Sequence, residues 1–331
     1  MEDVARVAGV SVATVSRTFN LPDRVTAKSR QRVEEAARAL GYYPNASART
    51  LRTQRSRVLG VVLPTLVNPV FAECLQGIAS AATAAGYSII PLTTEYQLPL
   101  EERAVGVLLA ANVDGMILVV SNPSESNALD RLAAADVPYV LAYNEHRDHP
   151  CIHVDSVAAV SALVDRLVAA GHRRIAMLSG SLAASDRAQQ RYRGYLQGMK
   201  QSRLAPDLLE IPFNASGAEI QAWLDRQGRP SALVCSNDLI AIRAVQAAHR
   251  EGLRVPEDLA IVGFDGIELG KDLTPVLSTV VQPNAQIGTS AVELVTEAIA
   301  GDSPLSPSQS RRVPWQFRQG ESCNWSVETP S

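Results

Sequence analysis

Hydrophobic residues in the first forty positions recur at the spacing of three short amphipathic helices. Ser11 and Thr26 are favourable N-cap residues for the second and third of these helices, because their hydroxyl groups accept hydrogen bonds from free backbone N–H groups. Gly9 allows a tight corner, and Gly41 suits a left-handed helix end. The positions predicted to face inward are Val4, Ala5, Ala8, Val33, Ala36, Ala37 and Leu40. This layout is typical of a helix-turn-helix, whose second helix enters the DNA major groove.

From residue 58 onward, short apolar runs alternate with amphipathic helical segments. Near-continuous Val, Ile and Leu runs are typical of parallel strands that helices cover on both faces. The eight predicted strands are residues 58–64, 88–94, 113–120, 137–143, 174–180, 208–213, 231–237 and 259–265. A polar loop after Tyr143 divides them into two groups of four. The sequence therefore predicts an α/β body of two doubly wound parallel-sheet subdomains, with a cleft at the carboxyl ends of the strands.

Charge separates the head from the body. Residues 1–57 contain 11 Lys and Arg and 5 Asp and Glu, a net charge of +6, whereas the other residues contain 20 and 29, a net charge of −9. A basic head on an acidic body indicates that the head contacts a polyanion such as nucleic acid. The alternative is a solvated charged face on a small helical bundle, which the helix-turn-helix pattern disfavours.

Length and composition fit a small head joined to a larger body. The chain has 331 residues, of which 46% are hydrophobic, enough for a sizeable core. No apolar run approaches the roughly 20 residues that span a bilayer, and the chain starts with a charged helix rather than a secretory signal. The four cysteines lie far apart, with no pair at metal-ligand spacing, and are interpreted as buried free thiols. We therefore expect a cytoplasmic protein with no membrane partner.

Seven runs spread over the chain carry family motifs. They are DVARVAGVSVATVSRTFN (3–20), RVTAKSRQRVEEAARALGYYPNASARTLRT (24–53), GHRRIAML (171–178), RYRGYLQGM (191–199), SNDLIAIRAV (236–245), GLRVPEDLAIVGFD (252–265) and TPVLSTVVQP (274–283). These runs resemble the Lac repressor/Gal repressor family of bacterial transcription regulators. The resemblance implies a repressor that binds a pseudo-palindromic operator in double-stranded DNA as a homodimer, with a body like a periplasmic sugar-binding protein.

The resemblance also implies a division into three parts and shows two departures. We predict a helix-turn-helix headpiece over residues 1–44, a hinge helix and linker over 45–57, and a two-lobed effector-binding and dimerisation domain over 58–331. The usual Thr before the first helix is absent, so we expect that the amino terminus is trimmed or misassigned. The leucine-heptad tail that makes the Lac repressor tetrameric is also absent.

The predicted recognition helix begins after Ser11. Val12 and Ala13 match positions at which family members touch base edges, and both offer apolar contact that suits a thymine methyl group. Arg17 follows one turn later and can donate two hydrogen bonds to guanine O6 and N7; a phosphate contact is the alternative. The residues assigned to phosphates or caps are Ser11, Thr14, Ser16 and Asn20.

Residues 45–51 resemble the family's hinge helix. Pro44 prevents continuation of the preceding helix, and Asn45 is a favourable N-cap for a new one. Because seven residues are too few for a stable isolated helix, we expect order only when the segment pairs with its twin on DNA. The resemblance implies that Leu51 wedges into the minor groove. The other predicted contacts of this segment are Ala48 and Arg52, the latter in the same narrowed groove.

Candidate effector-binding residues lie at predicted strand ends. Arg191, Asn237 and Asp265 match positions that hold the ligand in sugar- and purine-responsive relatives, and a guanidinium and a carboxylate suit vicinal hydroxyl groups. Phe71 could supply an apolar face for a ring. The second-tier candidates, for which a structural salt bridge is the alternative, are Asp155, Asp186 and Arg187. We expect a small sugar or sugar derivative, with a sugar acid or a nucleobase left open, and a wet cleft in which an orphaned charge costs little stability.

We predict no catalytic, metal or cofactor site. The His, Asp and Cys residues between positions 146 and 155 match no established zinc spacing, and residues 179–185 lack the Lys and the spacing of a phosphate-binding loop. The sequence shows no credible arrangement of a nucleophile, a base and an orienting group, so an enzymatic function has little support. The remaining rival to a ligand-controlled repressor is a sugar-binding or transport protein without a DNA role, which the basic head and the hinge segment disfavour.

Overall fold

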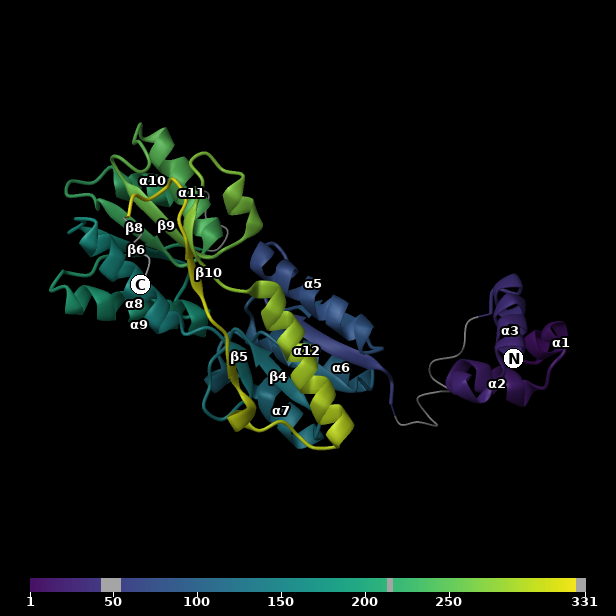
Figure 1. The fold of residues 1–331 in the computed structure, drawn as a ribbon. Coiled ribbons are helices and arrows are strands. Elements are labelled where there is room, and N and C mark those ends of the chain that lie inside the picture. Colours follow the sequence, from purple (N-terminus) through teal and green to yellow (C-terminus); the bar gives the residue numbers. More distant parts are fainter. Residues whose placement is uncertain (43–54, 213–216, 326–331) are drawn as a thin grey trace, which may run out of the picture. The chain divides into compact units, whose positions relative to one another are not determined.

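The computed structural model describes residues 1–42, 55–212 and 217–325. The chain forms two compact units, Met1–Ser56 and Arg57–Ser331, here named the headpiece and the body (Figure 1). In the described ranges, no helix is long and apolar enough to cross a membrane.

The headpiece is a bundle of three helices. They are α1 (Glu2–Ala8), α2 (Val12–Asn20) and α3 (Ala27–Ala39), with the short 3-10 helix η1 (Pro22–Arg24) between the last two. The predicted N-caps are confirmed, because Ser11 accepts a hydrogen bond from Thr14 N and Thr26 accepts one from Ser29 N. Gly9 turns the chain at the end of α1 with a φ of 62°, a conformation that suits glycine.

A small apolar core holds these helices together. Its buried members are Val4, Ala5, Ala8, Val15, Val33, Ala36 and Ala37. The prediction that Leu40 faces inward is wrong, since its side chain is 45% exposed. The reason is local: α3 ends at Ala39, so Leu40 is the C-cap and no longer follows the helical face.

The body contains two six-stranded sheets, which confirms the predicted fold class. The first sheet has the order β11–β5–β4–β3–β1–β2 and consists of β1 (Val58–Leu63), β2 (Ser88–Thr93), β3 (Gly115–Leu118), β4 (Tyr139–Ala142), β5 (Cys151–His153) and β11 (Arg311–Arg312). All of its strand pairs are parallel. We call this sheet and its helices the first lobe.

The second sheet forms the core of the second lobe. Its order is β12–β10–β9–β8–β6–β7, and its strands are β6 (Ile175–Ser179), β7 (Leu208–Glu210), β8 (Ala232–Cys235), β9 (Ala260–Asp265), β10 (Ser278–Val281) and β12 (Gln316–Arg318). The strands pair in parallel except for the edge strand β12, which is antiparallel to β10. All eight predicted strands are therefore present, and four short ones were missed.

Helices cover both faces of each sheet. The first lobe carries α5 (Pro69–Ala84), α6 (Leu98–Ala110), α7 (Asn127–Ala135), α12 (Asn284–Gly301) and the 3-10 helices η2 (Pro123–Glu125) and η4 (Pro307–Gln309). The second lobe carries α8 (Ser156–Ala169), α9 (Asp186–Gln201), α10 (Ala218–Leu224), α11 (Asp238–Arg250) and η3 (Glu268–Lys271). The close pairs α5–α12 and α8–α9 lie side by side (Figure 1). Residues on the two faces of a strand belong to separate apolar clusters. This is expected for a sheet that is buried on both faces.

The chain passes between the two lobes three times. The crossings lie between β5 and α8, between β10 and α12, and between β11 and β12. The predicted division after Tyr143 is therefore too early, because β5 follows it in the first sheet. Three crossing segments therefore join the lobes.

Candidate functional site

The second helix of the headpiece presents a mixed surface. Val12, Ala13 and Arg17 are exposed on α2, whereas Val15, between them, is fully buried in the core. The predicted recognition residues therefore share the solvent side of the helix.

The predicted phosphate and cap residues begin the same helix. Ser11 Oγ lies 3.1 Å from Thr14 N and 2.9 Å from Thr14 Oγ1, so the two side chains form one polar cap. Ser16 is half-buried in the middle of α2, and Asn20 is its last residue. The predicted hinge contacts Asn45, Ala48, Leu51 and Arg52 lie outside the described residues.

A cavity of about 260 Å³ lies in the body where the carboxyl ends of both sheets meet. The first lobe contributes Asn68, Val70, Phe71, Glu95, Tyr96 and Tyr143, which follow β1, β2 and β4. The second lobe contributes Gly180, Ser181, Ala184, Ser185, Arg187, Ala188, Arg191, Ser236, Asn237, Asp265 and Gln282. Aromatic rings, charged groups and small polar groups thus enclose one space, as in sites for small organic ligands.

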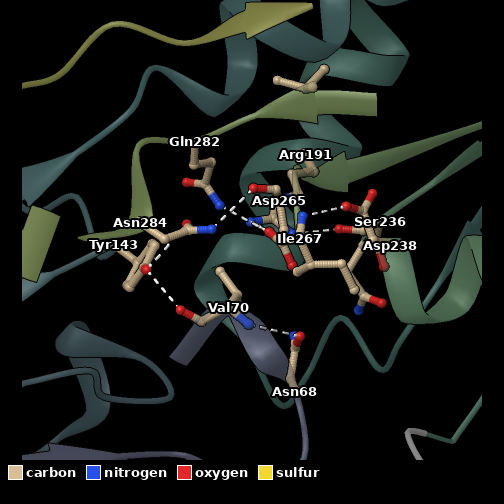
Figure 2. Close-up of polar contacts among 12 residues, drawn as sticks. Asn68, Val70, Tyr143, Arg191, Ser236, Asp238, Asp265, Ile267, Gln282 and Asn284 are labelled. Atoms are coloured by element: carbon tan, nitrogen blue, oxygen red, sulfur yellow. Dashed lines mark hydrogen bonds and ion pairs between the residues drawn. The ribbon is translucent and has the colours of Figure 1, made fainter. Parts of the chain in front are cut away.

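A buried ion pair lines this cavity. Arg191 Nη2 donates to Asp265 Oδ1 at 3.0 Å, and Arg191 Nη1 donates to the Ser236 carbonyl oxygen (Figure 2). The Arg191 guanidinium also lies over the Phe264 ring, 3.9 Å from its centroid, in a cation–π contact. The expectation of a wet cleft is wrong here, because Asp265 is 2% and Arg191 7% exposed.

Burial shifts the pKa values of the two partners in opposite directions. It raises the pKa of Asp265, while Arg191, Asn68 and Gln282 oppose that rise. Burial also lowers the pKa of Arg191, which Asp265 opposes. Each charge therefore depends on the other for compensation, so the two side chains form one preorganised unit.

Neighbouring side chains hold Asp265 in a constrained backbone conformation. Its φ is 112°, which is unusual for a residue with a side chain. Gln282 Nε2 donates to Asp265 Oδ1 at 2.8 Å, and Asn284 Nδ2 donates to the Asp265 carbonyl oxygen at 3.2 Å. Behind this loop, Asp238 accepts hydrogen bonds from Ile267 N at 2.8 Å and from Thr279 Oγ1 at 2.6 Å. The fully buried Asp238 thus fixes the backbone that carries Asp265.

The first-lobe wall is tied to the same network. Phe71 and Tyr143 pack edge to face with ring centroids 5.8 Å apart. Tyr143 Oη lies 3.2 Å from both the Val70 carbonyl oxygen and Asn284 Oδ1 (Figure 2). Because Asn284 also bonds to Asp265, the aromatic wall and the buried ion pair are linked through one side chain at the start of α12.

A second polar junction joins the lobes at the start of α9. Arg187 Nη1, from α9, donates to the Val120 carbonyl oxygen of the first lobe at 2.7 Å. Asn144 Nδ2, from the first lobe, donates to Asp186 Oδ1 at 2.9 Å, and Asp186 N donates to the Ser121 carbonyl oxygen at 2.9 Å. Three hydrogen bonds therefore cross between the lobes at the first turn of α9.

The structure brings five of the seven predicted effector residues to the cavity. Phe71, Arg187, Arg191, Asn237 and Asp265 line it, and Asn237 also caps α11 by accepting from Ile240 N. Asp186 is one residue from the lining and engages Asn144 instead.

Asp155 takes part in other contacts. Its carboxylate caps α8 by accepting from Ala158 N at 2.9 Å and pairs with Arg312 at 3.1 Å. The Asp155 carboxylate thus binds other protein groups, and Asp155 is not among the residues that line the cavity.

Sequence reasoning missed several lining residues. The missed side chains with polar atoms are Asn68, Glu95, Tyr96, Tyr143, Ser181, Ser185, Ser236 and Gln282. All of them lie in segments that follow the carboxyl end of a strand, and this position was the available signal. Gln282 follows β10, which was itself not predicted, so no such signal existed for it.

The His-rich segment forms an aromatic cluster of its own. The rings of His146 and His149 lie 4.8 Å apart, and His149 Nδ1 is 2.7 Å from Tyr139 Oη. Burial and the neighbouring His146 lower the pKa of His149. Within the part of the chain that the structure describes, no three His, Cys, Asp or Glu groups gather as metal ligands would.

Comparisons with known proteins agree with this two-part architecture. Residues 1–45 match the model of bacterial regulatory proteins of the lacI family, and residues 164–323 match that of the periplasmic binding protein-like domain. The chain is 33% identical to the HTH-type transcriptional repressor CytR of Escherichia coli K12 over 318 residues, which cover 93% of this chain and 92% of CytR. It is 32% identical to the ribose operon repressor of Haemophilus influenzae over 312 residues, 90% of this chain and 91% of that one.

A solved structure supports the same assignment. The Lac repressor dimer bound to operator and the anti-inducer ONPF superposes with a TM-score of 0.84 and 28% identity, covering 97% of each chain. The fold and the site thus define a DNA-binding transcription regulator with a ligand-binding body. The chain belongs to the lacI family of bacterial regulatory proteins.

Proposed function

We propose that this protein is a cytoplasmic repressor that binds a pseudo-palindromic operator as a homodimer and senses a small sugar or sugar derivative in the cavity. The observation that carries the proposal is the combination of two sites in one chain. The headpiece exposes Val12, Ala13 and Arg17 on a capped helix, and the body encloses a cavity between two lobes. The operator-bound Lac repressor dimer, which matches along almost the whole chain, supports the dimer.

The chemistry of the cavity supports a hydroxylated ligand. The Phe71 and Tyr143 rings offer an apolar face, while Asp265 and Asn237 offer oxygen atoms suited to hydroxyl groups. We infer no catalytic role for these residues, because they are engaged as a fixed binding surface. The effector acts through its different affinities for two lobe arrangements, which typically changes operator affinity by about 5- to 150-fold.

Binding of the protein to its own promoter region tests the proposal. A gel shift with the full chain should show a specific complex, whereas a sugar-binding or transport protein would give none. A thermal-shift screen of sugars, sugar acids and nucleobases then identifies the effector, and a titration of operator binding with that compound measures the coupling. Specific DNA binding that no cavity ligand alters would refute the sensing part of the proposal.

Replacing Arg17 by alanine should weaken binding to the preferred operator by about 1–3 kcal/mol and relax the base preference at one position in each half-site. The reason is the loss of two hydrogen bonds to one guanine. Gel shifts with operators altered at single positions measure both effects. Arg6→Ala is the matched control. Arg6 is an exposed arginine of α1, and its replacement removes the same charge from the headpiece. An equal loss of affinity for every operator variant would assign Arg17 to a phosphate instead.

A further inference from the structure

Arg187 has one nitrogen that the protein itself leaves unused. The side chain is 5% exposed and lines the cavity. Its Nη1 donates to the Val120 carbonyl oxygen and, at 3.0 Å, to Asp186 Oδ1. Its Nη2 is buried and has no hydrogen-bond partner among the described residues. A buried donor without a partner is unfavourable, so a group that enters the cavity and accepts a hydrogen bond from Nη2 removes this cost.

The surroundings of Nη2 favour an oxygen atom. Arg187 lies in the first turn of α9, a helix of 16 residues whose N-cap, Ser185, makes no side-chain capping hydrogen bond. Ser185 and Ala188 of this turn line the cavity too. The positive end of the helix dipole and the free guanidinium nitrogen therefore both attract an acceptor at the same place.

The charge balance favours an uncharged acceptor. Asp186 pairs with Arg187 at 3.0 Å, and Asp265 pairs with Arg191 at the same distance. Glu95 adds a further carboxylate to the lining. Because both arginines that line the cavity among the described residues have an acidic partner, a carboxylate on the ligand would meet no uncompensated positive charge there. A hydroxyl or carbonyl oxygen carries no such cost.

We propose that Arg187 Nη2 binds an uncharged oxygen of the effector, a hydroxyl or a carbonyl group, and that sugar acids are excluded from this position. The assignment rests on the proposed sensing function of the same cavity. Since Nη1 of the same guanidinium holds the first lobe, the ligand oxygen and the lobe junction share one rigid planar group. Arg187 is thus a specificity-determining residue that couples effector binding to the contact between the two lobes.

Crystals of the full chain soaked in glycerol or in sodium acetate test the proposal without knowledge of the effector. Glycerol offers hydroxyl groups and acetate a carboxylate. We expect a glycerol hydroxyl group within hydrogen-bond distance of Arg187 Nη2 and no acetate there. Acetate at Nη2, glycerol only elsewhere, or a protein atom bonded to Nη2 would each overturn the proposal.

The Arg187→Lys variant tests whether the planar guanidinium fork is needed to bind the ligand oxygen. Lysine keeps the charge but replaces the planar fork by a single ammonium group, so the glycerol site should be lost from these crystals. Arg193→Lys is the matched control on the same helix, because Arg193 is exposed, and it should keep glycerol bound. Glycerol retained in Arg187→Lys would overturn the assignment.

Gel shifts of the wild type and the Arg193→Lys control separate this inference from the proposed function. Both proteins should bind the promoter region alike without ligand. Failure of the wild type to bind DNA would refute the repressor function, whereas the soaks would still decide the role of Arg187.

Discussion

Replacing Asp265 by alanine is expected to lower the free energy of unfolding by about 3–5 kcal/mol, because it leaves the Arg191 guanidinium buried without its counter-ion. Arg191 is 7% exposed, and its attraction to Asp265 offsets the cost of burial. Arg191→Met should cost a similar amount, since Asp265 is then the orphaned charge. Urea denaturation of the full chain, followed by a signal from the body, measures both losses.

The double variant Arg191→Met/Asp265→Ala provides the critical comparison. Once both charges are gone, no orphaned charge remains, so the double variant should lose clearly less than the sum of the two single losses. Arg193→Met, on the exposed side of α9, is the control and should change stability by less than about 0.5 kcal/mol. Single losses as small as that of the control would show that solvent reaches the pair and that the cleft is wet.

Replacing Asp238 by asparagine is expected to remove a large pH dependence of stability. Burial, aided by the nearby Asp265 charge, raises the pKa of Asp238 from 3.8 to about 8. Between these values the unfolded chain has released the proton that the folded chain still holds. The free energy of unfolding of the wild type therefore falls as the pH rises from about 4 to about 8, in total by about 4–6 kcal/mol from this group.

The geometry around Asp238 explains why asparagine is a suitable substitute. Thr279 Oγ1 donates to Asp238 Oδ1 at 2.6 Å and also lies 3.3 Å from the Val280 carbonyl oxygen. When Asp238 is protonated, the first bond reverses, so that Asp238 donates to Thr279 Oγ1 and the Thr279 hydroxyl group donates to the Val280 carbonyl oxygen. An asparagine amide donates in the same way, and its oxygen still accepts from Ile267 N. Asp238→Asn should therefore match the wild type near pH 4 and exceed it near pH 8.

The measurement is urea denaturation of the wild type and the variant across this pH range. The difference between the two proteins isolates Asp238 from all other titrating groups. Asp272→Asn, which neutralises an exposed carboxylate at the end of η3, is the control and should show no comparable trend. A constant difference between wild type and Asp238→Asn from pH 4 to pH 8 would mean that Asp238 stays ionised in the folded protein.

The sequence by itself determined the elements that have strong local patterns. The helical spacing and the caps Ser11 and Thr26 predicted the headpiece, since a cap satisfies N–H groups only three residues away. The apolar runs predicted eight strands because a strand buried on both faces needs Val, Ile and Leu at nearly every position. Strand ends in parallel sheets converge, so Asn237 and Asp265 could be placed near the cleft, whereas Arg191, which lies on α9, was placed there by the family resemblance.

Only the tertiary structure decided the elements and contacts that depend on distant partners. The strands β5, β11 and β12 have two or three residues each, too few for a recognisable pattern, and they exist because they pair with neighbouring strands. The return of α12 to the first lobe brings Asn284 to Tyr143 and Asp265, which are far apart in the sequence.

The environment of each charge was likewise a tertiary property. Residue type and position suggested that Asp155, Asp186 and Asp265 could all bind a ligand. Asp155 instead caps α8, Asp186 joins the lobes, and Asp265 forms a buried pair with Arg191, 74 positions away along the chain. A charged side chain takes its role from the partners and the solvent that the folded chain leaves around it, and these are set by packing between elements rather than by the local sequence.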